Sequence, residues 1–381
     1  MRRDALMLLL IVSALLAWLF WQSREEPVVT DQLSLANVLG GSNEAFRAVT
    51  GPLPFEFPRD HGSHPEYQNE WWYFVGNLSA DTGERFGFQF TLFRFALEPG
   101  PELDSAWQTD QVWMAHLALS DADSATFYSH ERFARGALGL AGATPDRWWL
   151  RDWSVDATTD GWALTLPADD FELTLNLTQT RPLVFQGDQG FSRKGPNPGN
   201  ASRYYSATRL AASGQLRLLT SDTDTSFRVD GLAWLDREWG TGQLADDVAG
   251  WDWFSLQFDD GRDLMVYRLR HPDGSATEFS AGALVAADGQ SARILTADDF
   301  ESMPLRWWRD AEGVRWPLEW RIELADEAID IRVRAVFDEQ RWRASVPYWE
   351  GMVEFVNYRD PDQPLGRGYM ELSGYADHRR D

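Results

Sequence analysis

The stretch FGFQFTL at residues 86–92 places apolar side chains at every second position, with small or polar ones between them. Successive side chains of a β-strand point to opposite faces, so this period of two predicts a half-buried strand. The pattern recurs in FELTLNLT at 171–178, LEWRIEL at 318–324 and IDIRVR at 329–334. Antiparallel sheets with one face in a core give this alternation. We therefore expect an all-β protein built from antiparallel sheets.

Turn signals separate the predicted strands. Asp-Gly or Ser-Gly pairs, which favour tight hairpins, occur at 160–161, 213–214, 260–261, 273–274 and 288–289. No helical periodicity is long enough to supply βαβ units, which argues against a doubly wound nucleotide-binding fold. Many short strands in a chain of 381 residues indicate two barrel-like domains, because one core rarely extends over such a length.

The amino-terminal segment has the pattern of a membrane anchor. Arg2 and Arg3 precede an uninterrupted apolar run from Ala5 to Trp21, which would make about 26 Å of helix, enough to span a bilayer. The basic residues predict that everything after the run is extracytoplasmic. The run ends AWLFW at 17–21 without a small-x-small cleavage site, which favours an uncleaved anchor over a cleaved signal peptide. We expect a periplasmic-side location in the cell envelope, with membrane contact through this helix only.

Composition excludes several classes of function. The net charge of −24 argues against nucleic acid as a partner, because phosphates require a basic surface. The chain has no cysteine, so it has no disulfide, no thiolate metal site and no cysteine nucleophile. Phosphate-loop, HExxH and GxSxG motifs are absent from the sequence. We predict neither a cofactor nor a metal ion.

Aromatic residues are unusually frequent, with 20 Trp, 22 Phe and 10 Tyr. Such rings bury large areas and suit either a tightly packed core or the wall of a cavity for an apolar ligand. Composition leaves both interpretations open. The stretch 186–200, rich in Gly and Pro, is expected to be a long loop, either a lid over a barrel mouth or a plain surface excursion.

A first cluster of polar residues, DHGSHPE at 60–66, precedes an aromatic strand that begins at Glu70. The cluster suits either a metal ion or, because Gly and Pro make it a loop, a cap over a barrel end. Trp72 shares the strand face of Glu70, so the carboxyl is expected in an apolar space, with a raised pKa and the ability to act as an acid. The alternative is a buried ion pair with Arg94. His116 faces the same side of its strand as two apolar neighbours and is interpreted either as catalytic or as a satisfied core residue.

A second cluster combines acids with indole rings. Period two places Asp236 and Glu238 on one strand face and Arg237 on the other. Trp251 and Trp253 share a face a little further on. An acid beside aromatic walls suits protonation of an alkene, because the rings stabilise the carbocation that water then captures. The alternative is a polar seam between domains, in which the two acids pair with arginines.

Seven motifs resemble those of AttH-type proteins: HPEYQNEWWYF at 64–74, FGFQFTLFR at 86–94, MAH at 114–116, WLDREW at 234–239, GWDWF at 250–254, YWEG at 348–351 and GYMELSGY at 368–375. This family carries the label of a predicted secreted hydrolase and is similar to carotenoid hydratases. The resemblance covers residues 52–376. It implies two lipocalin-like barrels packed together, a ligand cavity near their junction, and association with ABC-type export systems.

The resemblance also implies roles for single residues. Asp236, Trp253 and Tyr267 match positions of the carotenoid hydratases. Arg237 stands where those enzymes have a histidine, and Arg268 where they have an acid, and both departures count against a true hydratase. The hydrolase label finds no nucleophile motif in this chain.

These observations divide the chain into a signal anchor or signal peptide at 1–22, a linker at 23–51 and two lipocalin-like domains at 52–240 and 241–376. The leading hypothesis is a binder of an apolar lipid or isoprenoid, connected to an ABC transporter permease. The candidate ligand contacts are Glu70, Trp72, Gln89, Arg94, Trp251 and Trp253. One alternative is a hydratase-like lyase or a cyclase, with Asp236, Glu238, Tyr267 and His116 as the catalytic candidates. Another is a non-catalytic structural adaptor of a membrane transporter.

Overall fold

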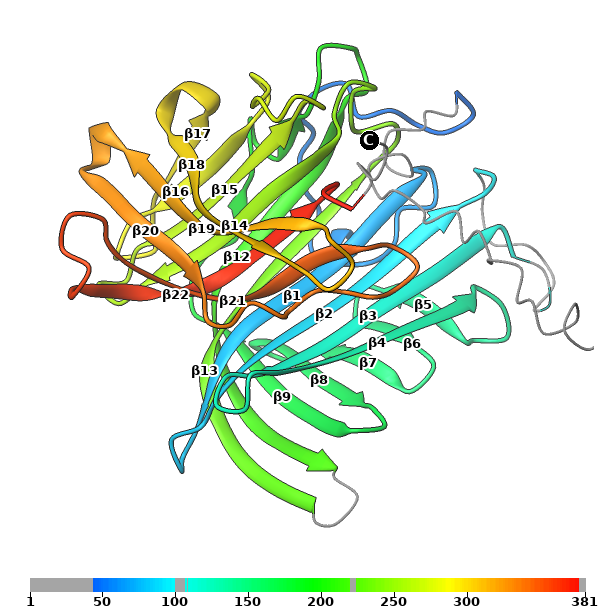
Figure 1. Ribbon diagram of the computed structural model, residues 1–381. Helices are drawn as coiled ribbons and strands as arrows, with labels where there is room; N and C mark the ends of the chain where they lie inside the picture. The colour runs from blue at the N-terminus through cyan, green and yellow to red at the C-terminus, as the bar shows by residue number, and fades with distance from the viewer. Residues whose placement is uncertain (1–43, 100–106, 108, 220–223, 377–381) are drawn as a thin grey trace, which may run out of the picture. The chain divides into compact units, whose positions relative to one another are not determined.

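Antiparallel strands make up most of the chain (Figure 1). The computed structural model describes residues 44–99, 107, 109–219 and 224–376, all of which belong to a single compact unit. The expectation of an all-β protein is confirmed. The apolar run Ala5–Trp21 lies outside the described residues, so the anchor stays a prediction. Within the described ranges, no helix has the length and hydropathy needed to cross a membrane.

The first sheet forms a nearly closed barrel. Its strands follow the order β4-β3-β2-β1-β13-β12-β9-β8-β7-β6-β5, and two short strands, β10 and β11, pair with β12. The bounds are β1 (Asn69–Ala80), β2 (Arg85–Ala96), β3 (Gln111–Asp121), β4 (Thr126–Arg135), β5 (Ala141–Thr144), β6 (Arg147–Leu150), β7 (Trp153–Ala157), β8 (Gly161–Pro167), β9 (Phe171–Gln179), β10 (Val184–Phe185), β11 (Phe191–Arg193), β12 (Ala201–Leu219) and β13 (Asp224–Gly240).

The second sheet forms a half-barrel, with its strands in the order β17-β16-β15-β14-β22-β21-β20-β19-β18. The bounds are β14 (Gly250–Phe258), β15 (Asp263–Arg270), β16 (Ala281–Val285), β17 (Ala292–Thr296), β18 (Glu301–Arg309), β19 (Arg315–Leu324), β20 (Ile329–Ala335), β21 (Tyr348–Asn357) and β22 (Pro364–Ser373). Three short 3-10 helices complete the described structure, at Arg59–His61, Ala297–Asp299 and Ala325–Glu327.

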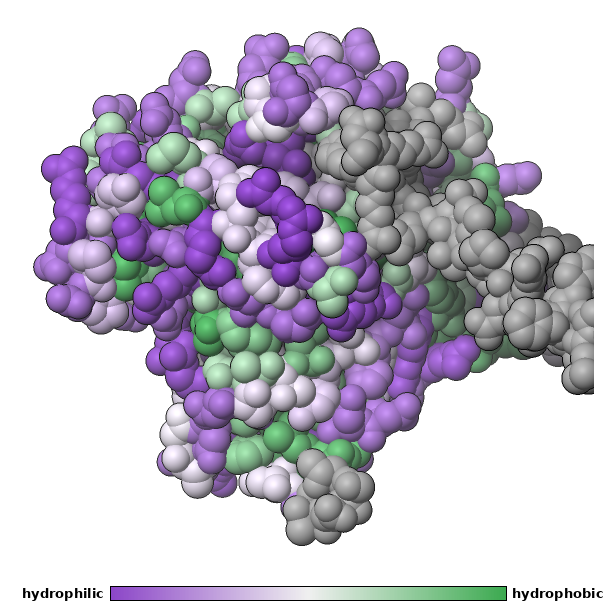
Figure 2. All heavy atoms as spheres, in the orientation of Figure 1, coloured by the Kyte–Doolittle hydropathy of each residue, from purple (hydrophilic) through white to green (hydrophobic). Residues whose placement is uncertain are grey.

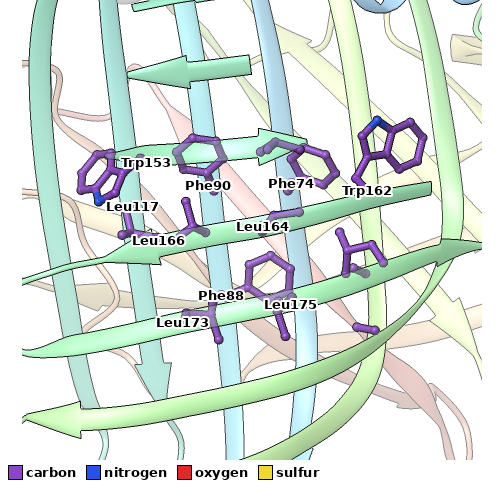
Figure 3. Packing of buried hydrophobic residues seen from close by; sticks show 14 of the residues in the cluster. Phe74, Phe88, Phe90, Leu117, Trp153, Trp162, Leu164, Leu166, Leu173 and Leu175 are labelled. Carbon is purple, nitrogen blue, oxygen red and sulfur yellow. The ribbon is translucent and has the colours of Figure 1, made fainter. Parts of the chain in front are cut away.

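The interior of the first barrel is filled with side chains. Phe74, Phe88, Phe90 and Trp153 interlock with leucines of β8 and β9, and all of them are buried (Figure 3). Each comes from the alternate positions that the sequence pattern assigns to one strand face. Burial of such apolar surface stabilises a fold by about 25 cal/mol per Å².

A second, separate core fills the half-barrel, with Trp316, Trp320 and Trp349 fully buried in it. Many of the large indole rings therefore belong to solid interiors and line no cavity. Of the two interpretations that composition leaves open, the packed core accounts for these residues.

The outer faces of the two sheets pack against each other. On β1, Trp72 and Phe74 point into the first barrel, whereas Tyr73 and Val75 belong to a third apolar cluster. This cluster, which we call the seam core, joins residues of both sheets, among them Trp234 and Tyr369. Strands buried on both faces lose the simple alternation of a half-buried strand. That explains why β1 has apolar side chains at consecutive positions.

Polar contacts also tie the two sheets together along this seam. The carboxylate of Asp263 on β15 is fully buried and accepts hydrogen bonds from Arg181 at 2.8 Å and from Arg209 at 2.7 Å. The side chain of Gln257 on β14 donates to the backbone carbonyls of Thr208 and Ala233 at 2.8 and 3.1 Å. These bonds satisfy polar groups that the packing of the sheets removes from water.

Hydrophilic residues predominate on the face seen in Figure 2, and hydrophobic ones gather in a band below the middle of the view. The exposed large apolar side chains of the described residues are dispersed along the chain, from Leu53 to Trp307. Scattered exposed apolar residues are usual for a folded protein and need no partner to explain them.

Candidate functional site

A pocket lies in the seam, between the outer faces of the two sheets. It has about 90 Å³ of space for molecules the size of water, and about 800 Å³ of empty space when the gaps between atoms and its open mouth are counted. Its lining is formed by Trp71, Tyr73, Thr91, Phe93, Lys194, Tyr204, Asp236, Glu238, Gln243, Leu244, Trp251, Trp253, Tyr267, Leu269, Tyr348, Glu350 and Glu371. Neither barrel interior contributes to it.

Strand register explains how the first sheet builds its wall of the pocket. Tyr73 on β1 is directly opposite Asp236 on β13, and Trp71 is directly opposite Glu238. Directly opposed residues of antiparallel strands share a face, with their Cβ atoms about 5 Å apart. Aromatic rings and carboxyl groups therefore alternate along this wall.

The second sheet builds the opposite wall in the same way. Tyr267, Trp253, Glu371 and Glu350 are successive cross-strand partners on β15, β14, β22 and β21. The row places two carboxyl groups side by side, next to an indole ring. The tertiary structure thus brings together acids from positions more than a hundred residues apart in the sequence.

Asp236 is buried and held by three donors. The Tyr204 hydroxyl donates to Oδ2 at 2.5 Å, while Ser206 and the Trp234 indole donate to Oδ1 at 2.5 and 2.7 Å. Burial raises the pKa of Asp236 to about 6, against the opposing effect of these hydrogen bonds. Near neutral pH this carboxyl can both hold and release a proton.

Glu238 has a cation as its partner. The Lys194 ammonium lies 2.9 Å from Glu238 Oε1, and it stands over the rings of Tyr267 and Tyr204 at 4.5 and 5.3 Å. Burial acts to lower the pKa of Lys194, but the charge and hydrogen bond of Glu238, together with Tyr267 and Asp236, outweigh it, and the pKa is raised. Lys194 therefore stays charged. The faces of Asp236, Glu238 and Arg237 agree with the sequence prediction, because both acids line the pocket and Arg237 does not.

Glu350 is the carboxyl group that burial affects most in the pocket. The Tyr73 hydroxyl donates to Oε1, whereas Oε2 is buried and has no hydrogen-bond partner among the described residues. Burial and the charge of Glu371 hold the pKa of Glu350 well above its usual range. Burial therefore favours the neutral carboxylic acid, in which the oxygen without a partner carries the proton.

Glu371 shares this environment. The Trp251 indole donates to Oε1 at 2.9 Å. Burial raises the pKa of Glu371 to about 7, with smaller contributions from the charges of Asp236 and Glu238.

Other deeply buried carboxylates of this protein are paired with arginines. Asp252 contacts Arg268 and Arg270 at 3.1 and 3.2 Å, and Asp263 contacts two arginines as described above. Within the described ranges, no ion pair reaches Asp236, Glu350 or Glu371. The fold thus stabilises its structural carboxylates with cations and leaves these three, which face the pocket, without one. The sequence alternative that Asp236 and Glu238 pair with arginines does not hold for the described residues.

His116 on β3 is fully buried at the edge of the pocket. Its Nδ1 lies 2.6 Å from the Tyr348 hydroxyl, and its Nε2 lies 2.9 Å from Glu131 Oε1. Its ring stacks on Trp342 at 4.5 Å. His116 does not line the pocket itself, but it touches Tyr348, which does.

The environment of Glu70 differs from the sequence expectation. Its carboxylate is buried between Arg94 and Arg237 and accepts a hydrogen bond from the His64 backbone at 2.9 Å. Burial acts to raise the pKa of Glu70, but the two guanidinium groups outweigh it, so the pKa is lowered, not raised. The ion pair with Arg94, which the sequence leaves as an alternative, is the arrangement observed.

This buried charge cluster is separate from the pocket. Trp72 covers it, with the Arg237 guanidinium 3.8 Å from the indole ring, and Arg94 donates to two backbone carbonyls. None of Glu70, Trp72 and Arg94 lines the pocket. The described residues contain no group of three or more His, Cys, Asp or Glu side chains placed to hold a metal ion. The last candidate contact, Gln89, is buried beside the pocket and donates to Thr91 at 2.5 Å.

Several pocket residues escape the sequence reasoning. Lys194 comes from the stretch 186–200, which is expected to be a loop but also contains β11. Glu350 and Glu371 stand in recognisable motifs of the chain, yet nothing in the local pattern shows that they face each other across β21 and β22. Tyr73 and Tyr204 look like ordinary strand aromatics. The only sequence signal available is the position of each residue on the outward face of its strand.

Similarity to solved structures extends over most of the chain. A crystal structure from Nitrosomonas europaea, assigned as an AttH, is 38% identical and superposes with a TM-score of 0.77 over 87% of this chain and all of the other. Kievitone hydratase from Nectria haematococca has a TM-score of 0.62 at 14% identity, over 88% of this chain and 98% of that one. CghA, solved with Sch210972, has a TM-score of 0.51 at 14% identity, over 87% and 97%. The last two show a shared fold.

No curated protein gives a significant match to the sequence. The sequence profile of the AttH-like family, by contrast, matches residues 48–375, which include both sheets and every residue of the pocket. With this match, and with a structural relative of 38% identity, the chain belongs to the AttH-like family.

Proposed function

We propose that the seam pocket binds a small, largely apolar ligand and adds water to, or removes water from, a carbon–carbon double bond of that ligand. The observation that carries this proposal is Glu350, a buried acid with an unpaired oxygen beside aromatic walls, whose pKa is raised by burial. A carboxylic acid kept neutral by burial is a suitable proton donor at neutral pH. The likeness in fold to a protein named kievitone hydratase supports the same direction.

The chemistry follows from the walls of the pocket. Glu350 gives its proton to one alkene carbon, which leaves a positive charge on the other carbon. The rings of Tyr73 and Trp253, and the carboxyl groups without arginine partners, stabilise that charge. Water then forms the new carbon–oxygen bond and loses a proton to a base, and Glu350 regains a proton. In the reverse direction the same groups remove water.

The test is turnover of a defined set of alkenes. Geraniol, linalool and a prenylated phenol are incubated with the protein in water labelled with ¹⁸O, and mass spectrometry records a gain of labelled water. Glu350→Gln should lower the rate by about 10²-fold or more, the range for loss of a general acid. Glu354→Gln is the matched control on the same strand, because Glu354 pairs with Arg334 outside the pocket.

Binding must be measured in the same variants. The neutral fluorophore N-phenyl-1-naphthylamine reports occupancy of an aromatic pocket, and its affinity should change less than about threefold in Glu350→Gln, since Gln has a similar volume. Wild-type rates in Glu350→Gln would refute the assignment of the acid. Failure of the wild-type protein to hydrate any of the alkenes would refute this reaction.

A second function, binding without turnover, is favoured by the aromatic lining itself. Trp71, Phe93, Trp251 and Trp253 present wide apolar surfaces to one space, as carriers of apolar ligands do. A carrier should release an extractable apolar molecule when the purified protein is denatured. Native mass spectrometry would detect that molecule as added mass, and repeated preparations without it would count against this function.

We further propose that the protein works on the extracytoplasmic side of a membrane, beside an ABC-type permease. The basic residues Arg2 and Arg3 and the apolar run Ala5–Trp21 support the location. Fusion of alkaline phosphatase after residue 381 tests it, because that enzyme is active only outside the cytoplasm. Co-purification of a permease with the full chain would support the partner, and an inactive fusion would refute the location.

A further inference from the structure

Three residues form a hydrogen-bonded chain that leads into the pocket. Tyr348 lines the pocket, and its hydroxyl lies 2.6 Å from His116 Nδ1. His116 Nε2 lies 2.9 Å from Oε1 of Glu131, its cross-strand partner on β4. The chain crosses the seam, because Tyr348 belongs to the second sheet and the other two residues belong to the first.

The surroundings decide where the protons are. Glu131 accepts hydrogen bonds from the Ser345 hydroxyl at 2.6 Å and from the Ser345 backbone N–H. Burial acts to raise the pKa of Glu131, but these bonds and the contact with His116 outweigh it, so the pKa is lowered. Glu131 is therefore a carboxylate, and the proton of the imidazole is assigned to Nε2. Burial lowers the pKa of His116, so the ring is neutral and its Nδ1 has a free lone pair. The Tyr348 hydroxyl must then donate to Nδ1.

We propose that Tyr348 is the catalytic base of the reaction, with His116 receiving its proton and Glu131 stabilising the imidazolium that forms. This inference rests on the function proposed above. Tyr348, His116 and Glu131 stand in the order hydroxyl, base and orienting carboxylate. The same arrangement activates hydroxyl groups in unrelated enzymes. Tyr348 remains a phenol at rest, because burial raises its pKa well above the usual range. It loses its proton only as it receives another from water.

Acid and base are then neighbours on one strand. Tyr348 and Glu350 are two residues apart on β21 and share a face, which places their Cα atoms about 7 Å apart on one wall of the pocket. Water gives a proton to Tyr348 as it attacks the cation, and the original Tyr348 proton moves to His116. Once the product leaves, a water molecule in the pocket carries a proton from Tyr348 to the Glu350 carboxylate, and His116 returns one to Tyr348. The cycle closes with one water added and every residue restored.

The test uses the reactivity of the phenol and needs no turnover. Benzenesulfonyl fluoride is a neutral aryl probe that sulfonylates activated tyrosines: the phenol oxygen bonds to sulfur, fluoride leaves, and the proton goes to the neighbouring base. Peptide mass spectrometry of the full chain should show Tyr348 labelled at least tenfold faster than Tyr204 and Tyr267, which line the same pocket. These two tyrosines are internal controls for access of the probe.

Two variants separate activation from packing. His116→Gln should slow labelling of Tyr348 at least tenfold, and Glu131→Gln should slow it about threefold, because the ring stays in place without its carboxylate. Binding of N-phenyl-1-naphthylamine must remain within threefold of the wild type, which shows that the seam is intact. Labelling of Tyr348 no faster than that of the other two tyrosines, or unchanged in Glu131→Gln, overturns the proposal.

The outcome for the base is distinct from the outcome for the proposed function. If Glu350→Gln abolishes hydration of the alkenes while His116→Gln leaves it unchanged, the function stands and the base is wrong. If Tyr348 is activated as described but no alkene reacts in the wild type, the base stands and the reaction is a different one.

Discussion

At the scale of single residues, the surroundings of a carboxyl group decide what it does in this protein. Glu70 and Glu350 are equally buried, at 1% exposure each. Two guanidinium groups contact Glu70, whereas Glu350 faces a pocket and another acid. Glu70 is therefore a structural carboxylate, whereas Glu350 is an acid that can donate a proton.

The raised pKa of Glu371 predicts a dependence of stability on pH. An isolated glutamate has a pKa of 4.5, and in the folded protein Glu371 has one of about 7. The folded state binds more protons between these values, so its stability falls as pH rises from about 4.5 to about 7, and stays lower above. Glu371→Gln removes this loss while keeping an oxygen that accepts the hydrogen bond of the Trp251 indole.

Guanidinium unfolding of Glu371→Gln should show a free energy of unfolding about 1–3 kcal/mol higher than that of the wild type at pH 8, and no difference at pH 4. Glu354→Gln is the control, and equal effects at both pH values would contradict the assignment.

The buried charge cluster gives a second prediction at this scale. Glu70→Gln leaves Arg94 and Arg237 without their shared carboxylate in a site that water does not reach. Breaking a buried pair from one side costs about 3–5 kcal/mol, and we expect that loss in urea unfolding. Glu172→Gln, which removes an exposed partner of Arg217, should cost less than about 1 kcal/mol. Similar losses in the two variants would show that the cluster contributes little.

At the scale of the strands, the two sheets approach each other closely where β2 faces β21 and β22. A Cβ atom at Gly87 would lie 2.1 Å from Met352 Cγ and 2.6 Å from the Tyr369 hydroxyl. The two sheets can therefore pack this closely in the seam core only because residue 87 has no side chain.

Gly87→Val should accordingly separate the sheets locally. Overpacking of a filled core costs about 1–3 kcal/mol, and we expect a loss of that size in guanidinium unfolding, together with weaker binding of N-phenyl-1-naphthylamine. The control is Gly51→Val, because no atom lies within 4 Å of a Cβ built at Gly51. Unchanged stability in Gly87→Val would mean that Met352 moves aside without consequence.

At the scale of the whole molecule, the described residues make one folding unit from two sheets. The seam core and the hydrogen bonds around Asp263 and Gln257 depend on both sheets at once. Either sheet alone would expose an apolar outer face to water, which is unfavourable by about 25 cal/mol per Å².

Thermal unfolding should therefore be a single transition. Scanning calorimetry is expected to give one peak, with the calorimetric enthalpy equal to the van't Hoff enthalpy. Arg209→Ala, which removes a partner of Asp263, should lower the temperature of that one peak without splitting it. Two resolved peaks in the wild type would show that the sheets unfold independently.

The β class and the strand faces could be predicted from the residues alone, because side-chain alternation is a local property of an extended backbone. FGFQFTL at 86–92 shows which residues share a face, and the same rule placed Asp236 and Glu238 together. It did not show which face of β1 meets the first barrel and which meets the second sheet, since both are apolar. The tertiary structure alone decided that Glu350, Glu371, Lys194 and Tyr348 meet Asp236 in one pocket, and that Glu70 does not. Residues so distant in the chain become neighbours only through strand register and sheet packing, and the pKa values that matter for function arise from that meeting.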